Sequence, residues 1–401
     1  MKIGIITSES FPIGMATTNR IHSLAKGLTL NGCTVEVLCF RTTEDKNHPF
    51  NQKKSGKNDG IFYEYTTRTI YRPEKRFERG IEVIYGMIGL LRKIKNGKYD
   101  VLITTTPYFI STLLSKNVAK IKKIPIIMTV DEYPHVVLAP EKYNKLFSKV
   151  YLKEFYKSVD GFVAITDTLL KYYKKIADDK AKFVHIPMTV DIHRFEGKKK
   201  VPVELEGCRY IAYCGKLGLK NKDGVPILIE AFEGLKKEIQ DIKLVIIGST
   251  VPSEIQVVNQ LKKLVKNLQL ENDVIFAGKK SKEIVPNYLC NAEALVLARP
   301  DNLQAKGGFP TKLGEYLATG KPVVVTEVGE IPRFLNETNA FMAKPGNIVS
   351  IKDALKKALT SSNASSIGKR GKKVAYENFA YEVQSKRLFN FIEGILRNTQ
   401  K

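Results

Sequence analysis

The most informative stretch of the chain is Gly307-Gly-Phe-Pro-Thr-Lys-Leu-Gly-Glu315, which continues as Tyr-Leu-Ala-Thr-Gly-Lys-Pro322. Short apolar runs typical of buried strands flank it at Ala294–Leu297 and Pro322–Thr326. Between them, the glycine pair gives a flexible approach to a helix expected over Thr311–Ala318. The order strand, loop, helix, strand predicts one unit of a doubly wound α/β fold.

The same alternation extends outward over the whole chain. Further strands are expected at Lys2–Thr7, Thr34–Cys39, Ile61–Thr66, Val101–Thr105, Ile124–Thr129, Gly161–Ile165, Arg209–Cys214, Ile242–Ile247 and Asp273–Phe276. Helices are expected at Ala16–Leu30, Ile81–Lys95, Lys145–Ser158, Thr168–Lys175, Gly224–Ile239, Ser253–Leu268, Ser281–Cys290, Ile348–Thr360, Ser366–Asn378 and Ala380–Arg397. Strands that alternate with helices predict parallel sheets.

The periodicity lapses once, after Pro187, through a Lys-rich stretch that ends near Gly207. A chain of 401 residues suits two domains of about 200 residues each. We therefore expect two Rossmann-like domains, at 1–190 and 208–378, joined by a linker at 191–207. A closing helix over 379–401 follows, and one option for it is to cross back to the N-terminal domain.

Composition narrows the class of protein. There is no run of about 18 apolar residues, and the start of the chain turns polar too early for a secretory signal. Five cysteines without a C-x-x-C spacing argue against a disulfide framework and a zinc site, so a cytoplasmic location is expected. The formal charge of +24 favours an anionic partner, whether nucleic acid, an anionic membrane surface or a phosphorylated substrate. Solvated lysine-rich faces are an equally good explanation of this charge.

Two loops that follow predicted strands are candidate anion sites. Gly14 comes after the first strand, where a tight turn can present backbone amides at a helix N-terminus. Gly215-Lys216 follows the first strand of the second domain, and Lys222 lies six residues beyond Lys216. Both ammonium groups could converge on phosphates. A plain structural turn and a solvated basic loop are the alternatives.

The Gly307–Glu315 stretch is the third candidate. The amides of Thr311 and Lys312 point out of the first helical turn, and Lys312 adds charge. One turn deeper, Glu315 could accept hydrogen bonds from a ribose diol. Arg299, just after the preceding strand, places another cation at the same edge. An ordinary helix with a capping turn is the alternative.

These three loops resemble those of the retaining glycosyltransferases of family 4, which have the GT-B fold of two Rossmann-like doubly wound domains facing a central cleft. The resemblance covers nearly the whole chain. In that family the first-strand glycine loop and a G-R/K-L loop with a second lysine bind the donor diphosphate, and a Glu-x7-Glu motif holds sugar and ribose. The residues that match are Gly14, Gly215, Lys216, Lys222 and Glu315. Gly307 stands in place of the first glutamate.

The resemblance implies further site residues. Asp131 lies in Thr129-Val-Asp-Glu-Tyr-Pro-His135, where many members carry a histidine instead of the valine, and it would orient the donor sugar or the acceptor hydroxyl. A helix-capping role is the alternative for Asp131. Donor contacts are also expected at Gly278, Arg299, Gly308, Phe309, Thr311 and Lys312, and acceptor contacts at Thr17, Thr18, Asn19, Arg20 and His135.

The resemblance also implies an activity. A hexosyl or N-acetylhexosaminyl group would pass, with retention, from a UDP- or GDP-sugar to a glycan or a polyprenyl-diphosphate-linked saccharide. Lysines would replace a divalent metal, no cofactor is implied, and the chain has no D-x-D motif. The form F-P-T-K-L-x-E-Y-L-A-T-G-K-P is similar to a branch that acts in bacterial capsule, O-antigen or exopolysaccharide synthesis.

One segment of the N-terminal half has a composition that suits a membrane surface. Arg68–Arg79 interleaves cations and aromatics ahead of the amphipathic Ile81–Ile94, which could dock on the anionic inner face of a membrane; a solvated loop before a packed helix fits equally well.

A GT-B sugar-nucleotide epimerase would need acid/base carboxylates that we cannot place. A basic nucleic-acid-binding protein would need a stacking platform or a recognition helix, and the sequence has neither pattern, so no nucleic-acid partner is expected.

Overall fold

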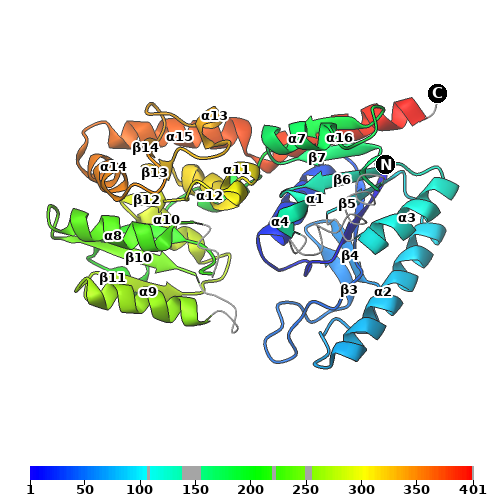
Figure 1. The fold of residues 1–401 in the computed structure, drawn as a ribbon, viewed down its shortest axis with the longest axis horizontal. Helices are drawn as coiled ribbons and strands as arrows, with labels where there is room; N and C mark the ends of the chain where they lie inside the picture. Colours follow the sequence, from blue (N-terminus) through cyan, green and yellow to red (C-terminus); the bar gives the residue numbers. More distant parts are fainter. Residues whose placement is uncertain (106–108, 138–154, 219–222, 249–254, 400–401) are drawn as a thin grey trace. The chain divides into compact units, whose positions relative to one another are not determined.

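The computed structural model describes residues 1–105, 109–137, 155–218, 223–248 and 255–399. The chain separates into two compact units, each built on its own twisted sheet (Figure 1). Unit 1 consists of Met1–Thr189 together with Tyr381–Lys401, and unit 2 of Val190–Ala380. Both are Rossmann-like α/β units, as the alternation of strands and helices predicted.

The sheet of unit 1 has the strand order β3-β4-β2-β1-β5-β6-β7-β8. Its strands are β1 Lys2–Thr7, β2 Thr34–Cys39, β3 Ser55–Asn58, β4 Ile61–Tyr65, β5 Val101–Thr104, β6 Ile126–Val130, β7 Gly161–Ala164 and β8 Lys182–His185. All pairs are parallel except β3 with β4. Because β1 lies between β2 and β5, the direction of winding changes beside β1, where such sheets bind ligands.

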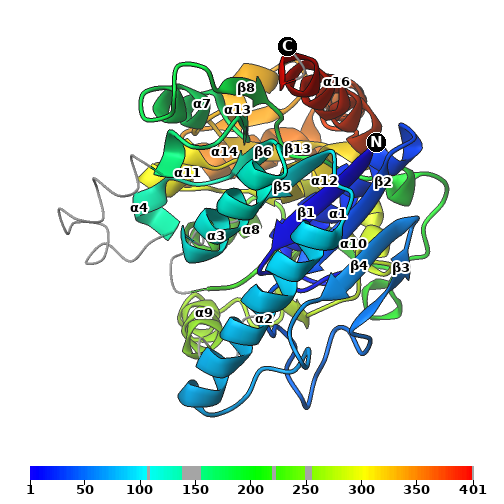
Figure 2. The same ribbon diagram turned by 90° about the vertical axis from the view of Figure 1, so that its right-hand side faces the viewer.

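Helices cover both faces of this sheet. They are α1 Ala16–Leu30, α2 Arg76–Asn96, α3 Phe109–Ile121, α4 Pro134–Val137, α7 Asp167–Lys174 and α16 Tyr381–Thr399. On one face α1 and α16 pack against Ile3, Val35 and Ile103. On the other face α2 and α3 pack against Leu38 and Leu102, and Figure 2 shows these two helices side by side.

The last helix of the chain is part of unit 1. Its Leu388, Ile392 and Ile395 are buried with residues of α1. The two helices approach so closely that a methyl group at Gly27 of α1 would overlap Ser385 of α16. The close approach therefore requires glycine on α1 and a small side chain on α16.

The sheet of unit 2 is entirely parallel, in the order β11-β10-β9-β12-β13-β14. Its strands are β9 Arg209–Cys214, β10 Ile242–Ile247, β11 Val274–Gly278, β12 Ala294–Leu297, β13 Val323–Thr326 and β14 Phe341–Ala343. The α-helices are α8 Val225–Lys236, α9 Ile255–Asn267, α10 Val285–Asn291, α11 Leu303–Gly307, α12 Thr311–Thr319, α13 Ile331–Phe334, α14 Ile348–Thr360 and α15 Ala364–Asn378. Here the winding changes direction between β9 and β12.

The stretch 191–207, which we expected to be a linker, clusters with unit 2. It forms two short 3-10 helices, η1 Ile192–Phe195 and η2 Val203–Leu205, that bury Phe195 and Leu205. At the boundary, the Val190 amide donates a hydrogen bond to the Phe379 carbonyl. The lapse in periodicity therefore marks irregular but packed backbone.

Some elements differ from their predicted bounds. Helix α2 begins at Arg76, five residues before the expected start, because its polar first turn does not interrupt the helix. Strands β3, β8 and β14 and helices α3, α4, α11 and α13 were not predicted. The expected helix Lys145–Ser158 lies largely outside the described residues. Within the part of the chain that is described, no helix is long and apolar enough to span a membrane.

Candidate functional site

In both units the candidate residues follow strands of the parallel sheet, at or near the change of winding. In unit 1, Gly14 follows β1 and Asp131 follows β6. In unit 2, Gly215 follows β9 and Arg299 follows β12. Because the carboxyl ends of parallel strands share one sheet edge, each sheet gathers its candidates there.

The Gly14 loop of unit 1 is closed on itself. A side chain at Gly14 would overlap the Thr18 hydroxyl, which donates a 2.7 Å hydrogen bond to the Ser10 carbonyl. Thr18 is almost fully buried and its side chain holds the loop, and its expected contact with an acceptor stays a prediction. Helix α1 begins directly after Met15 with no side chain capping its first amides. Thr17 is half-buried there and Asn19 is exposed.

A buried carboxylate, Glu44, anchors this loop from a neighbouring segment. Its Oε1 accepts hydrogen bonds from the Ser10 hydroxyl at 2.6 Å and from the Asn51 amide at 2.8 Å. Its Oε2 accepts from the backbone amides of Phe50 and Asn51. Burial acts to raise the pKa of Glu44, but these hydrogen bonds outweigh it and lower the pKa.

Arg20 and Asp131 form an ion pair inside unit 1, with the guanidinium Nε 3.3 Å from the Asp131 Oδ1. The other guanidinium nitrogens donate to the carbonyls of Ile186 and Pro187. Arg20 is buried; it fixes the chain after β8 and pairs with Asp131, and its expected contact with an acceptor stays a prediction. Burial raises the pKa of Asp131, and Arg20 partly opposes that shift. His135, half-buried on α4, stacks on Tyr133.

In unit 2, helix α12 is docked on the end of β9. The Tyr316 hydroxyl accepts a 2.6 Å hydrogen bond from the Cys214 amide and donates to the Cys214 carbonyl. A side chain at Gly215 would overlap the ammonium group of Lys312, so this backbone and this cation are in direct contact. Lys216, the next residue, is exposed, whereas Lys222 lies outside the described residues.

Glycines also bring neighbouring strand ends together. The Gly248 amide after β10 donates a 2.8 Å hydrogen bond to the carbonyl of Gly278, the last residue of β11. Gly248 has a φ of 140°, and a side chain there would overlap the Gly215 carbonyl. The ends of β9, β10 and β11 therefore meet backbone to backbone, leaving Gly215 at the centre of the sheet edge.

The Lys312 ammonium is held by Asp223, the residue that precedes the N-cap of α8. Lys312 pairs with the Asp223 carboxylate and donates to the Tyr213 hydroxyl at 3.2 Å. The Tyr213 hydroxyl in turn donates to Asp223 at 2.8 Å. Burial acts to raise the pKa of Asp223, but Lys312 outweighs it and lowers the pKa. The positive charge expected at the start of α12 is therefore present on Lys312, and it is paired with the Asp223 carboxylate.

Glu315 lies one turn further along α12 and is also paired. Its Oε1 is 2.6 Å from Nη1 of Arg194, which belongs to η1. Both side chains are partly accessible, at 17% for Arg194 and 26% for Glu315. Thr311, half-buried, opens α12, and no side chain caps the first turn of that helix.

The segment before α12 differs from its prediction. The glycine pair is not a flexible approach, because Gly307 ends helix α11, whose first turn is capped by a 2.8 Å hydrogen bond from the Ala305 amide to Asn302. Phe309 is buried against Phe334 and Phe379, and its expected contact with the donor stays a prediction.

Arg299 is buried beside the end of this segment. One of its guanidinium nitrogens donates to the Gly308 carbonyl at 3.4 Å. Its own carbonyl accepts a 2.7 Å hydrogen bond from Thr326 at the end of β13. Arg299 therefore ties the chain between α11 and α12 to the ends of β12 and β13.

Two family patterns match this chain. The pattern described as Glycosyltransferase Family 4 matches residues 17–194, and the one described as Glycosyl transferases group 1 matches residues 195–374. Together they run without a gap. The chain belongs to the GT-B glycosyltransferases.

Individual relatives of this glycosyltransferase agree with that family. It is 24% identical over 346 residues to alpha-monoglucosyldiacylglycerol synthase of Streptococcus pneumoniae, an alignment that covers 81% of this chain and 70% of that protein. Sucrose-phosphate synthase from Thermosynechococcus elongatus has the same fold, with a TM-score of 0.78, 14% identity and 99% of both chains covered. An Anabaena protein solved with UDP and glucose gives a TM-score of 0.71 at 16% identity, covering 98% of this chain and all of that one.

Several residues at the sheet edges of this GT-B glycosyltransferase were not among the predicted site residues: Glu44, Asn51, Arg194 and Asp223. Each contacts a predicted residue or loop from a distant part of the chain; Arg194 and Glu315, for example, are 121 residues apart. Asp223 also has a distant partner, Lys312, but its place next to the predicted Lys222 on the basic loop was a sequence signal that could have identified it.

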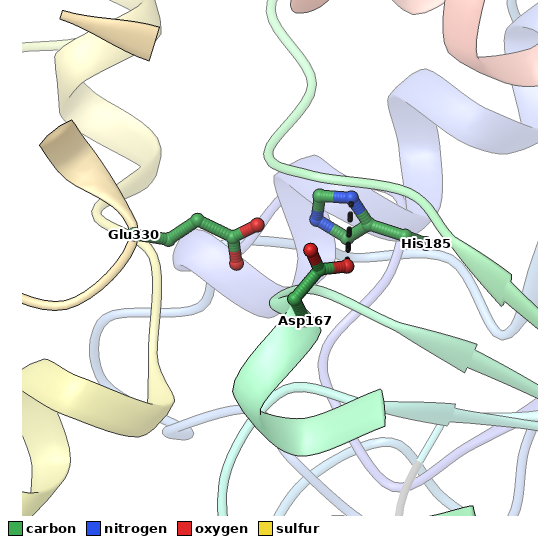
Figure 3. Close-up of side chains that lie close together, drawn as sticks. All are labelled: Asp167, His185 and Glu330. Atoms are coloured by element: carbon green, nitrogen blue, oxygen red, sulfur yellow. Dashed lines mark ion pairs between the residues drawn. The ribbon is translucent and has the colours of Figure 1, made fainter. Parts of the chain in front are cut away.

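Asp167 and His185 form a further ion pair in unit 1 of the glycosyltransferase, with 3.7 Å between the carboxylate and Nδ1 (Figure 3). His185 ends β8, and its Nε2 lies 3.2 Å from the Ile165 carbonyl. Glu330, also drawn in Figure 3, belongs to unit 2, where it pairs with Arg333 at 2.9 Å.

Proposed function

We propose that this glycosyltransferase moves a hexosyl or N-acetylhexosaminyl group from a nucleoside-diphosphate sugar to a saccharide or lipid-linked saccharide. The observation that carries the proposal is the meeting of Gly215, Lys312 and Glu315 at the carboxyl edge of the unit 2 sheet. A diphosphate needs cations and backbone amides, and a ribose needs an acceptor for its hydroxyls. The end of β9 and the first two turns of α12 together supply the cations, the backbone amides and the carboxylate acceptor.

The diphosphate would bind where β9 ends and α12 begins. The first turn of α12 has no side-chain cap, so its amides and its positive dipole end are suited to an anion. Lys216 is exposed on the adjoining loop, and Lys312 contacts the Gly215 backbone. The Anabaena protein of the same fold was solved with UDP and glucose, which supports a UDP-sugar as the donor.

The chemistry assigned to the protein is stabilisation of the leaving group. The bond between the sugar and the diphosphate breaks, and the acceptor oxygen forms a new bond to the same carbon on the same face. The acceptor proton passes to the departing phosphate oxygen, so no side chain is required as a base. Lys216, Lys222 and the α12 amides would stabilise the charge that develops on the diphosphate. Asp131, held by Arg20, would orient the sugar or the acceptor hydroxyl.

Gly307 removes a carboxylate that the family pattern places near the sugar. Arg299 is the proposed substitute, because its guanidinium is already bonded to the backbone between α11 and α12 at Gly308. The arrangement would give the sugar pocket a cation in place of an anion. We expect the choice of donor sugar to reflect this change.

The acceptor is proposed to be carried by a membrane, on its inner face. Phe77, Ile84 and Ile88 lie on one stripe of α2 and are exposed by 79%, 60% and 40%. Exposed cations precede and begin the helix at Arg72 and Arg76. An apolar stripe flanked by cations suits an anionic bilayer. A polyprenyl-diphosphate-linked saccharide would be reached there, as in surface polysaccharide synthesis.

Incubation of the purified chain with UDP- and GDP-sugars and a panel of polyprenyl-linked saccharides tests the proposal. We expect one donor to be consumed together with acceptor, and NMR of the product to show the donor's anomeric configuration. Consumption of no nucleotide sugar, with or without acceptor, would overturn the proposed function. Inversion at the anomeric carbon would overturn the proposed mechanism alone.

A further inference from the structure

Arg194 is fixed on several sides beside the carboxylate of Glu315. Its Nη1 is 2.6 Å from the Glu315 Oε1, and its Nη2 donates to the Lys282 carbonyl at 2.5 Å. The guanidinium also lies over the ring of Phe195, 5.3 Å from its centroid. A planar group with directed donors, held in this way, has little freedom to follow a mobile carboxylate. Arg194 therefore dictates where the Glu315 carboxylate lies.

The helix that carries Glu315 is itself fixed. Leu313 and Leu317 on either side of it are buried, and the Tyr316 hydroxyl is bonded to the Cys214 backbone. Because the backbone is fixed by these contacts and Oε1 by Arg194, the position of Oε2 is also set. A carboxylate offers about four acceptor positions, so the pair leaves capacity for a ligand with two neighbouring hydroxyls.

We propose that Arg194 is the positioning residue for recognition of the nucleotide's ribose: it pre-orients Glu315 so that its remaining acceptor positions bind the 2′- and 3′-hydroxyls. This inference rests on the proposed function, in which Glu315 accepts from the ribose. A glutamate that is already ordered loses little side-chain entropy when the nucleotide binds. If the glutamate were flexible, the entropy lost on ordering its side chain would reduce the free energy gained from binding the ribose.

A purely structural role for Arg194 predicts something different. The Arg194 contacts join η1 to α12 and to the Lys282 backbone, so their loss would loosen this side of unit 2 as a whole. Every nucleotide would then bind less tightly, whatever its sugar. A positioning role affects only the hydrogen bonds to the two ribose hydroxyls. The affinity for a nucleotide that lacks these hydroxyls should then be unaffected, which separates the two roles.

The test is calorimetric binding of UDP and of 2′,3′-dideoxy-UDP to the full chain and its variants, repeated with the GDP pair. We expect the wild type to bind the ribonucleotide about tenfold or more tightly than its dideoxy analogue, since hydrogen bonds to a charged group are lost. In Arg194→Met and in Glu315→Ala this ratio should fall to near one, while the dideoxy affinity stays within about twofold. The double variant should match Glu315→Ala, and Arg194→Lys should recover part of the ratio.

Arg209→Met is the matched control, because Arg209 also pairs with acidic side chains in unit 2 but at Asp241 and Glu293. Its ratio should equal that of the wild type. If Arg194→Met bound UDP and its dideoxy analogue less tightly by the same factor, or left the ratio of the two affinities unchanged, the positioning role would be overturned. Glu315→Ala would still test ribose binding by Glu315 itself. If the wild type bound neither UDP nor GDP, the proposed function would fail, and this inference with it.

Discussion

The side-chain amide of Asn51 binds both polar backbone atoms of Ile13. Its Oδ1 accepts from the Ile13 amide at 3.0 Å, and its Nδ2 donates to the Ile13 carbonyl at 2.9 Å. Asn51 is buried and its Nδ2 also donates to Glu44, so the residue before Gly14 is held by a side chain that has a hydrogen-bond partner of its own. The loop after β1 has its shape before any ligand arrives.

Removal of this clamp should weaken donor binding. In Asn51→Ala the Ile13 backbone loses both partners, and the Gly14 loop must be ordered by the ligand itself. We expect the KM for the nucleotide sugar to rise about tenfold while kcat changes less, in steady-state kinetics. Asn31→Ala is the control, since Asn31 bonds the Gly27 carbonyl at the other end of α1. A larger fall in kcat than rise in KM would contradict a role in positioning.

Glu44 should make stability depend on pH. Its pKa is lowered in the folded chain, so its contribution is present above the ordinary value of about 4.3 and is lost as the pH falls through the folded value. We expect Glu44→Gln to reduce the free energy of unfolding by about 2 kcal/mol at pH 7. The difference from the wild type in thermal unfolding should shrink toward pH 3. A difference that is constant with pH would show that charge is not involved.

The pair of Lys312 and Asp223 should be coupled energetically. Removing the carboxylate alone, in Asp223→Ala, leaves a partly buried ammonium without its counter-ion and should destabilise unit 2 by about 3 kcal/mol. Adding Lys312→Met should recover much of that loss, because the uncompensated charge is then gone. Chemical denaturation of the two single variants and the double variant measures the coupling. Additive losses would show that the two side chains act independently.

The strands were well predicted where most positions of a segment are apolar and buried in the sheet. Lys2–Thr7, Thr34–Cys39, Arg209–Cys214 and Ile242–Ile247 have the predicted bounds. The β3 strand was missed because Ser55–Asn58 is polar and exposed at the sheet edge, with no pattern to mark it. Helix α11 was missed because an asparagine cap, and no apolar stripe, defines its five residues.

The candidate site also contains residues that could be predicted from the sequence and residues that could not. Glycines on loops after strands could be predicted, because a close backbone approach excludes other residues, as Gly215 against Lys312 illustrates. The partners that charge and orient the site could not, since Glu44 and Arg194 reach it from distant segments. The burial of Phe309 and Arg20 also depends on packing that spacing does not reveal.

The exposed stripe of α2 should bind anionic lipid. Changing Phe77 and Ile84 to glutamate removes apolar surface and reverses local charge, so sedimentation with vesicles rich in anionic lipid should weaken about tenfold or more. The melting temperature should not change, because both side chains are exposed. Leu30→Glu, at an exposed position at the end of α1, is the control and should bind as the wild type does. Equal loss in the control, or none in the α2 variant, would contradict the proposed surface.

The central claim is that unit 2 holds a nucleoside diphosphate between the end of β9 and the first turns of α12. The most direct measurement is the turnover of the nucleotide sugar by Lys216→Ala and Glu315→Ala, with thermal unfolding to show that both remain folded. Each variant should lose about a hundredfold or more in kcat/KM, because charge stabilisation and ribose binding are lost separately. Lys263→Ala, exposed on α9, should keep full activity. Near-normal turnover in both Lys216→Ala and Glu315→Ala would contradict the site.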